Sequence, residues 1–387
     1  MHAERLLSPA LRLPGASAPK AHPPTVVSHA GEAITLSKRL ELLDASRGLA
    51  ALFVVVWHWQ HFYDFSAPDF DRSHQPLYSV LLPAYSQGPF AVDLFFCLSG
   101  FVFFWLYSEK IVLGRVPARD FFLLRFSRLY PLYVLTLLFV AASFLAFGEF
   151  VYRHDAYHFV LNLFLASSVG LEKGLSYNGP SWSISVEFVL YGLFFVGCRW
   201  MRSRSLLVLL GMIVGLEMWP IYEPIARGLM SFFAGAAAYL VYRSLSRSAA
   251  PAAVAVAALC WLVTMARIYF VESDAPHFLL NVWALLVLFP STMVALALAR
   301  PVGAPSIAAL RFLGDISYSV YLLHFPLQVI FNQFDLDFDA PWVLGLFFAL
   351  LIPLSAASHY GFEMPAQRWL RNVLAVPRPV AVPQARS

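Results

Sequence analysis

The sequence has little charge: Asp, Glu, Lys and Arg together make up 13% of its 387 residues. A soluble domain typically carries about 25% charged residues, so this chain lacks the polar surface that a soluble fold of its length needs. Cysteine is also scarce. Cys97, Cys198 and Cys260 lie far apart in apolar runs without any CxxC pair, which excludes a zinc motif and a disulfide framework. We expect all three to be buried apolar side chains and expect no metal site.

The two ends of the chain lack long apolar runs. Residues 1–37 have no continuous apolar core of the kind a signal peptide needs, and prolines that include Pro14, Pro19, Pro23 and Pro24, with scattered charge, predict a disordered cytoplasmic tail. Residues 373–387 again carry proline and arginine and predict a loose C-terminal tail. The region between them, 38–372, is predicted to be one transmembrane domain. The net charge of +4 is modest, and we expect no nucleic-acid partner.

Apolar residues dominate the rest: 59% of the chain is hydrophobic, with 35 Phe, 17 Tyr and 10 Trp. Runs of about 20 apolar residues are the mark of membrane-spanning helices. The sequence therefore predicts an all-α, polytopic transmembrane bundle of about ten spans. The predicted spans are 48–63, 90–107, 129–148, 180–198, 205–219, 225–242, 250–270, 277–299, 312–332 and 341–360.

The charges between the spans predict an orientation. Basic residues follow every even-numbered span, for example at Arg199 to Arg204 and at Arg368, whereas the intervening loops are acidic or neutral. The positive-inside rule then places both termini in the cytoplasm. Segment 158–169 is too short to cross, and a full span there would break the alternation, so we expect a re-entrant or surface helix. We expect a multi-pass protein of a bacterial inner membrane.

Ionisable side chains inside the spans are candidate functional groups, because each costs at least about 2.5–3.5 kcal/mol at mid-membrane. Arg47 and His58 are eleven residues apart, so they share one helix face within about 20° and are separated by about 16 Å. Asp44 lies close to that face. Arg47 could be a positive-inside anchor and His58 an interhelical hydrogen-bond partner. The shared face and the nearby His61 favour a functional role.

Three further ionisable groups stand in apolar surroundings: Asp93, Glu187 and His324. The topology places Asp93 and Glu187 in the outer half of the membrane near the depth of His58, and His324 near the middle. Together they predict a polar cavity in the bundle. Each carboxylate either pairs structurally with a neighbouring cation or has a direct chemical role.

Arg125 and Arg128 lie three residues apart on one side of a helix that begins at the inner surface. They either anchor that helix or, with Arg47, offer planar and permanently charged groups suited to phosphate.

Five blocks with polar residues in register follow one another along the chain. The first is the Arg-Gly pair Arg47 and Gly48, followed after ten residues by His58. The later blocks are VDLFFCLSGF (92–101), RFSRLYPLY (125–133), NGPSWSISVEF (178–188) and ISYSVYLLHFP (316–326). In these blocks and their order the sequence resembles the membrane acyltransferase-3 family, whose members O-acylate carbohydrates and similar acceptors. The resemblance covers about residues 40 to 371. It implies ten spans, Arg47 and His58 as the essential pair, and acyl-CoA as donor, with no tightly bound cofactor.

The layout predicts how such a donor would bind. The phosphates of acyl-CoA, by default acetyl-CoA, would rest on Arg47, Arg125 and Arg128, and the pantetheine arm would thread toward His58. His58 would act as a general base, which we favour, or as a nucleophile that carries the acyl group. Asp93 or Glu187 would orient its imidazole.

The acceptor is expected to be a hydroxyl of a carbohydrate or of a lipid-linked glycan in the membrane. Trp57, Trp59, Tyr177 and Trp182 would either stack on this sugar or form an interfacial aromatic belt.

A rival function is a proton-coupled secondary transporter, in which His58, Asp93, Glu187 and His324 would relay protons. Transporters commonly contain an internal repeat, and the sequence shows none.

Overall fold

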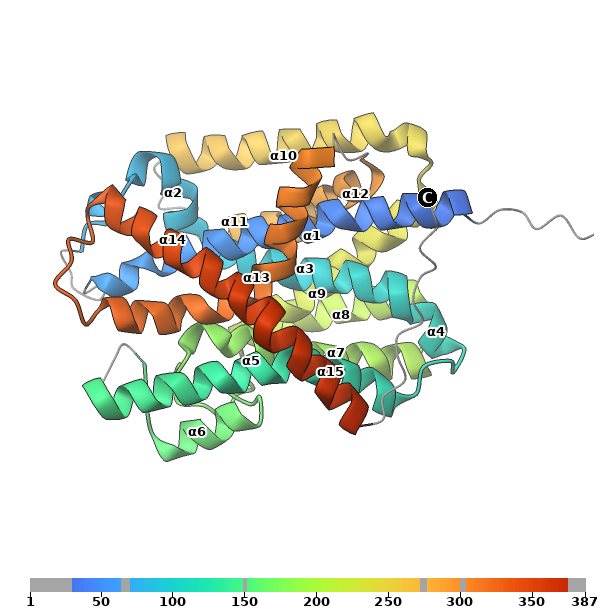
Figure 1. The fold of residues 1–387 in the computed structure, drawn as a ribbon. Helices are drawn as coiled ribbons and strands as arrows, with labels where there is room; N and C mark the ends of the chain where they lie inside the picture. Colours follow the sequence, from blue (N-terminus) through green and yellow to red (C-terminus); the bar gives the residue numbers. More distant parts are fainter. Residues whose placement is uncertain (1–29, 64–69, 149–151, 272–276, 300–303, 375–387) are drawn as a thin grey trace, which may run out of the picture.

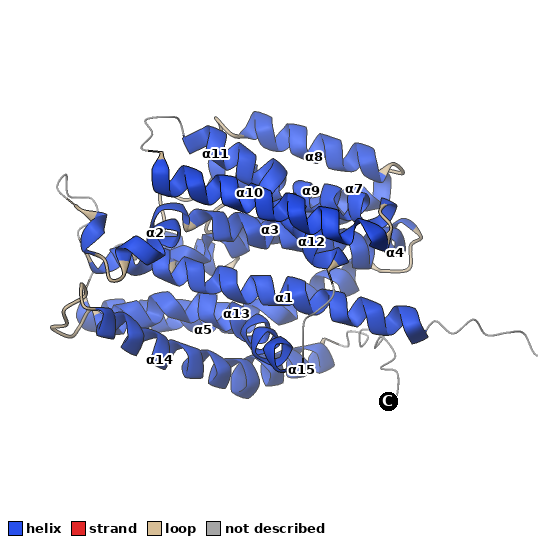
Figure 2. Cartoon of the chain, turned by 90° about the horizontal axis from the view of Figure 1, so that it is seen from above, coloured by secondary structure: helices blue, strands red, loops and turns tan. Residues whose placement is uncertain are grey.

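A computed structural model describes residues 30–63, 70–148, 152–271, 277–299 and 304–374. Within these ranges the backbone forms helices and loops, and the only β pairing is an isolated bridge between Arg153 and Ser176. Figure 2 shows this all-helical architecture, which confirms the all-α part of the predicted fold class. Most of the tail predicted at 1–37 and all but the start of that predicted at 373–387 lie outside the described residues.

The helices are numbered along the chain. They are α1 (Ala30–His58), α2 (Tyr78–Gln87), α3 (Pro89–Phe103), α4 (Glu109–Val112), α5 (Ala118–Phe147), α6 (Ala156–Leu163), α7 (Trp182–Trp200), α8 (Arg204–Met218), α9 (Glu223–Ser244), α10 (Ala250–Phe270), α11 (His277–Trp283), α12 (Phe289–Leu298), α13 (Ala304–Phe331), α14 (Pro341–Ser358) and α15 (Met364–Val373). Single π-helical turns at Phe104–Ser108, Ala284–Leu288 and His359–Glu363 join α3 to α4, α11 to α12 and α14 to α15.

Eight helical segments of the described chain are long and apolar enough to cross a membrane. They are Leu42–Phe62, Pro89–Val112, Ala118–Phe147, Gly179–Trp200, Glu223–Ser244, Arg247–Phe270, Leu279–Leu298 and Pro341–Val373. Each matches one predicted span, so the protein is an integral, multi-pass membrane protein.

The other two predicted spans, 205–219 and 312–332, correspond to α8 and α13, which are outside that set of eight. α8 has 15 residues and is about 22 Å long, shorter than the roughly 30 Å hydrocarbon core. α13 has 28 residues but carries Arg311, Asp315 and His324. The count of ten and the cytoplasmic location of both termini stay predictions.

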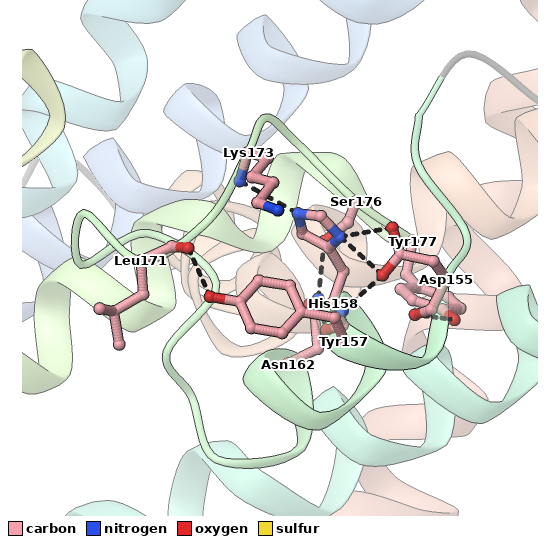
Figure 3. Close-up of polar contacts among 8 residues, drawn as sticks. All are labelled: Asp155, Tyr157, His158, Asn162, Leu171, Lys173, Ser176 and Tyr177. Atoms are coloured by element: carbon pink, nitrogen blue, oxygen red, sulfur yellow. Dashed lines mark hydrogen bonds and ion pairs between the residues drawn. The ribbon is translucent and has the colours of Figure 1, made fainter.

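Segment 158–169, which we expected not to span, forms only the eight-residue helix α6 and a following loop. The Asp155 carboxylate caps α6 by accepting from the main-chain N–H of His158 at 2.8 Å, and the His158 ring Nδ1 lies 2.8 Å from it. These contacts hold the pKa of Asp155 below its usual value. The other ring nitrogen of His158 accepts from the main-chain N–H of Lys173 at 3.1 Å (Figure 3). His158 therefore ties the loop to α6.

Glycine lets two pairs of helices touch backbone to backbone. A Cβ atom added to Gly48 in α1 would lie 2.7 Å from Leu313 in α13, and one added to Gly314 would lie 2.6 Å from a main-chain oxygen of α1. Gly100 and Gly235 allow the same approach between α3 and α9. Small residues are the usual means of close helix packing in membranes. The glycine of the Arg-Gly pair thus sets the distance between α1 and α13.

α1 contacts both α13 and α3 inside the bundle. In Figure 1, α10 lies along the upper edge, α5 and α6 lie along the lower edge, and α14 with α15 crosses the front diagonally. The three cysteines are buried and unpaired, as expected.

Candidate functional site

One face of α1 organises the site. The helix is continuous from Ala30 to His58, so Arg47 and His58 keep the predicted spacing of about 16 Å along its axis. Arg47 pairs with Asp44, with Nη1 and Oδ1 3.1 Å apart, and 21% of its side chain is exposed. The two ends of this face are called here the Arg47 end and the His58 end.

Arg47 lines a cavity of about 100 Å³, called here the arginine cavity. Arg125 and Arg128 of α5 and Glu187 of α7 line it as well, so the three arginines expected to share a basic surface meet at one cavity. On α3 its lining extends from Val92 to Phe103, a rise of about 16 Å. The arginine cavity is therefore elongated along the helices, in the direction that leads from the Arg47 end to the His58 end.

Aromatic rings fix the guanidinium group of Arg125. Its Cζ atom lies 4.7 Å from the centre of the Phe103 ring and 4.9 Å from that of Tyr107, and Nη2 donates to the Tyr107 hydroxyl at 2.5 Å. Its Nε is buried without a hydrogen-bond partner. Arg128 makes no hydrogen bond or ion pair within the described ranges. Both groups keep donors available, and guanidinium is permanently charged.

Glu187 lies away from the place we expected. Its carboxylate accepts from Ser99 at 2.9 Å and from Tyr191 at 2.5 Å, and it shares the arginine cavity with Arg47. It makes no contact with His58 among the described residues, so it does not orient that imidazole here. The physical reason is the rotation of α7, which turns Glu187 toward α3 and the positive charge of Arg47.

Asp93 also differs from the expectation that it would orient His58. It is 1% exposed and forms a two-point ion pair with Arg227 of α9, with distances of 2.7 and 3.2 Å. Arg227 further donates to the Pro89 carbonyl. The alternative of structural pairing therefore describes Asp93. Arg227 stands inside the predicted span 225–242, so its charge was a signal that the sequence already contained.

The histidines meet at the His58 end. His58 Nδ1 lies 2.9 Å from the Val54 carbonyl and 3.2 Å from His324 Nε2. A carbonyl can only accept, so Nδ1 of His58 carries the proton and the His324 nitrogen accepts from it. The lone pair of the neutral His58 imidazole is then on Nε2, which makes no hydrogen bond with the described part of the chain. This arrangement leaves Nε2 able to take a proton.

Gln328 and Tyr152 support this histidine pair. Gln328 Nε2 donates to the main-chain oxygen of His58 at 2.8 Å, at the end of α1 where helix carbonyls lack intrahelical donors. Next to His58, with ring centres 5.0 Å apart, His61 contacts the Tyr152 hydroxyl at 3.0 Å. Gln328 was missed because it is uncharged, although it follows His324 by one helical turn.

Tyr321 borders the arginine cavity and lies next to His324 on α13. Its side chain lines the cavity, and its ring centre is 6.0 Å from that of His324, which is fully buried.

The aromatic residues predicted either to stack on a sugar or to form an interfacial belt are mostly packed into the bundle. Trp59 is fully buried, and Tyr177 is 5% exposed with its hydroxyl bonded to the Asp155 carbonyl. Trp182 is half-buried, with its ring packed edge-on at 6.2 Å from Phe96. Only Trp57 and Trp182 keep partial exposure, so a continuous four-residue platform does not form.

Arg371 is a fourth arginine near the cavity that the sequence suggested only as part of a basic loop. α15 packs on α5, and Arg119 of α5 donates to the Leu374 carbonyl at 2.7 Å, which fixes the end of α15. The charge of Arg371 is repelled by Arg125 and Arg128, and its Nε is buried without a partner.

Glu363 is a second missed residue. It is 9% exposed and accepts hydrogen bonds from Ser319 of α13 and Ser358 of α14, the latter at 3.2 Å. It lies three residues beyond the predicted span 341–360, so it was not counted among the intramembrane charges.

Comparisons with known proteins identify the family of this chain. A family model described as an acyltransferase domain, acyltransferase-3, matches residues 40–359. The chain is 42% identical over 108 residues to "Protein 2 in picA locus" of Rhizobium radiobacter, covering 28% of this chain and 47% of that protein. It is 30% identical over 171 residues to "Acyltransferase MdmB" of Streptomyces mycarofaciens, covering 43% of this chain and 41% of that protein. The chain thus spans less than half the length of either relative. No solved structure matches it.

Proposed function

Because this chain belongs to the acyltransferase-3 family, we propose that it moves an acyl group from acyl-CoA to a hydroxyl of a carbohydrate or glycan precursor. One observation carries the proposal. The same face of α1 bears Arg47, which lines a cavity together with two other arginines, and His58, whose Nε2 is able to act as a base. The relative named as an acyltransferase supports the same reaction type. The proposed site of action is a bacterial inner membrane.

The arginines suit the phosphate groups of coenzyme A. Arg47, Arg125 and Arg128 present permanently charged, planar donors, and Arg–phosphate contacts are often bidentate. The elongated cavity would hold the slender pantetheine arm, and acetyl is the proposed acyl group. Glu187 lies among these arginines and would help to hold Arg47 toward the cavity.

The chemistry at His58 is a proton transfer that accompanies acyl exchange. The acceptor oxygen attacks the thioester carbonyl, a C–O bond forms, and the C–S bond breaks. His58 Nε2 takes the proton from the hydroxyl and returns it to the departing CoA sulfur. General base catalysis of this kind is worth about 10²–10⁴ in rate. The Val54 carbonyl and His324 accept from Nδ1 and would stabilise the imidazolium that forms.

Asp93 has a supporting part in this proposal, because its carboxylate is already occupied by Arg227. His324 acts on His58 rather than on substrate. Trp182, the first residue of α7, is partly exposed and is left as the candidate for stacking on the acceptor sugar.

The test is release of free thiol from acetyl-CoA by the purified protein in nanodiscs of neutral lipid. Reactions run with no acceptor and with a panel of monosaccharides, oligosaccharides and lipid-linked sugars, followed by mass spectrometry of the acceptors. His58→Ala should abolish transfer. His74→Ala, on an exposed surface histidine, is the matched control and should keep it. The absence of any His58-dependent acyl transfer across the panel would contradict the proposal, and a transporter would consume no thioester.

A further inference from the structure

The ring of Tyr321 adjoins both the arginine cavity and His324 of the histidine pair. It lines the cavity on one side and lies 6.0 Å from the His324 ring, centre to centre, on the other. His58 and His324 are not among the residues that line the cavity. Tyr321 therefore borders both the arginine cavity and the histidine pair.

Two hydrogen bonds hold this ring by its hydroxyl group. The Tyr321 hydroxyl donates its proton to the Pro180 carbonyl, which can only accept. Ser183 lies 2.7 Å from the same hydroxyl and must therefore be the donor in that contact. Pro180 belongs to the short segment that leads into α7 and Ser183 to the first turn of α7, so the ring is fixed between α13 and the start of α7.

The same segment is tied to α13 a second time. Asn178 Nδ2 donates to the Leu322 carbonyl at 3.0 Å. Phe95 packs edge-on against the Tyr321 ring with centres 5.8 Å apart, and Tyr321 is 6% exposed. Moving the ring would break two hydrogen bonds and disturb a close-packed contact, and polar groups left unpaired in such surroundings are costly.

We propose that Tyr321 is a specificity-determining residue: its ring, held by these two hydrogen bonds, narrows the passage from the arginine cavity to His58 and admits only short acyl groups. This inference rests on the proposed function, because it assumes that the donor enters by the arginine cavity and reacts at His58. An acetyl group has one carbon beyond the carbonyl, whereas butyryl and hexanoyl chains must displace the ring. The ring therefore selects the acyl group before chemistry begins.

The experiment compares acetyl-, butyryl- and hexanoyl-CoA as donors for the purified protein, with thiol release as the readout and kcat/KM as the quantity. Tyr321→Ala removes the ring and should raise the hexanoyl-to-acetyl ratio of kcat/KM at least about tenfold, the lower end of what one methylene is worth in an apolar pocket. Tyr321→Phe keeps the ring but loses the two hydrogen bonds of the hydroxyl group. The hexanoyl-to-acetyl ratio of kcat/KM should therefore rise by less than in Tyr321→Ala. Tyr321→Leu keeps an apolar side chain in the bundle and serves if the alanine variant does not fold.

Tyr130→Ala is the matched control, because Tyr130 also donates its hydroxyl to a main-chain carbonyl, that of Leu163, but does not line the cavity. Its hexanoyl-to-acetyl ratio should stay near that of the unmodified protein. An equal rise in both alanine variants would show general loosening and overturn the inference, as would an unchanged ratio in Tyr321→Ala and Tyr321→Leu. If the unmodified protein shows no His58-dependent thiol release, the proposed function itself fails; a failure confined to the Tyr321 variants leaves that function standing.

Discussion

The ion pair between Asp93 and Arg227 gives the sharpest prediction about which carboxylate is structural. Asp93 is 1% exposed, and Arg227 contacts both of its oxygens. Arg227→Met would leave a buried carboxylate without its partner, and breaking a buried pair in this way costs about 3–5 kcal/mol. We expect a loss of that size in the free energy of unfolding.

The partner substitution should cost less. Asp93→Asn leaves Arg227 with the Pro89 carbonyl at 3.1 Å and Glu223 at 3.6 Å, so its charge keeps two acceptors. We expect a loss of about 1–3 kcal/mol, the range for one disrupted buried hydrogen-bonding group. The double variant removes both charges and should be more stable than Arg227→Met alone, because the stranded carboxylate is gone.

The assay is equilibrium unfolding of the four proteins in mixed detergent micelles, combined with transferase activity per folded molecule. A double-mutant cycle isolates the interaction between the two side chains. Strictly additive losses would refute the structural ion pair. A kcat reduced by 10² or more in well-folded Asp93→Asn would instead restore the catalytic role that the sequence suggested.

The remaining predictions concern topology and the donor. A reporter fused at Glu172 should report outside, and an inside report would turn 158–169 into a true span. Arg47→Ala should weaken CoA binding about tenfold or more, as expected for a lost charge-assisted contact, whereas His58→Ala should leave CoA affinity intact and abolish transfer; unchanged affinity in Arg47→Ala would remove its phosphate role. Arg371→Ala should weaken CoA binding about tenfold and leave pantetheine binding unchanged, with the exposed Arg368→Ala as control; equal effects of the two variants would indicate a general surface-charge effect.

The sequence predicted most of the helices because the signal for a membrane span is local. About 20 consecutive apolar residues suffice to identify one, and eight predicted spans coincide with helices of sufficient length. The shared face of Arg47 and His58 was predictable for the same reason, since it follows from helical periodicity within α1 alone.

The partners of the buried carboxylates could not be predicted in this way. Depth along a helix follows from residue number, but the neighbour that a side chain meets depends on the rotation of each helix and on which helices are adjacent. Asp93 faces Arg227, 134 positions later in the chain, and Glu187 faces Ser99. Both contacts are set by helix–helix packing, of which a single sequence carries little trace.

Gly48 connects the predictable part of the site to the unpredictable part. It directly follows Arg47, and α13 lies against it so closely that a Cβ atom would collide with Leu313. Eleven residues further along α13 is His324, and ten residues beyond Gly48 along α1 is His58; their ring nitrogens are 3.2 Å apart. A larger residue at position 48 would push the two helices apart at one end and so shift the histidines at the other. The Arg-Gly pair and the histidine that follows it therefore depend on one another, because the glycine sets the separation of α1 and α13 at which the two histidines contact each other.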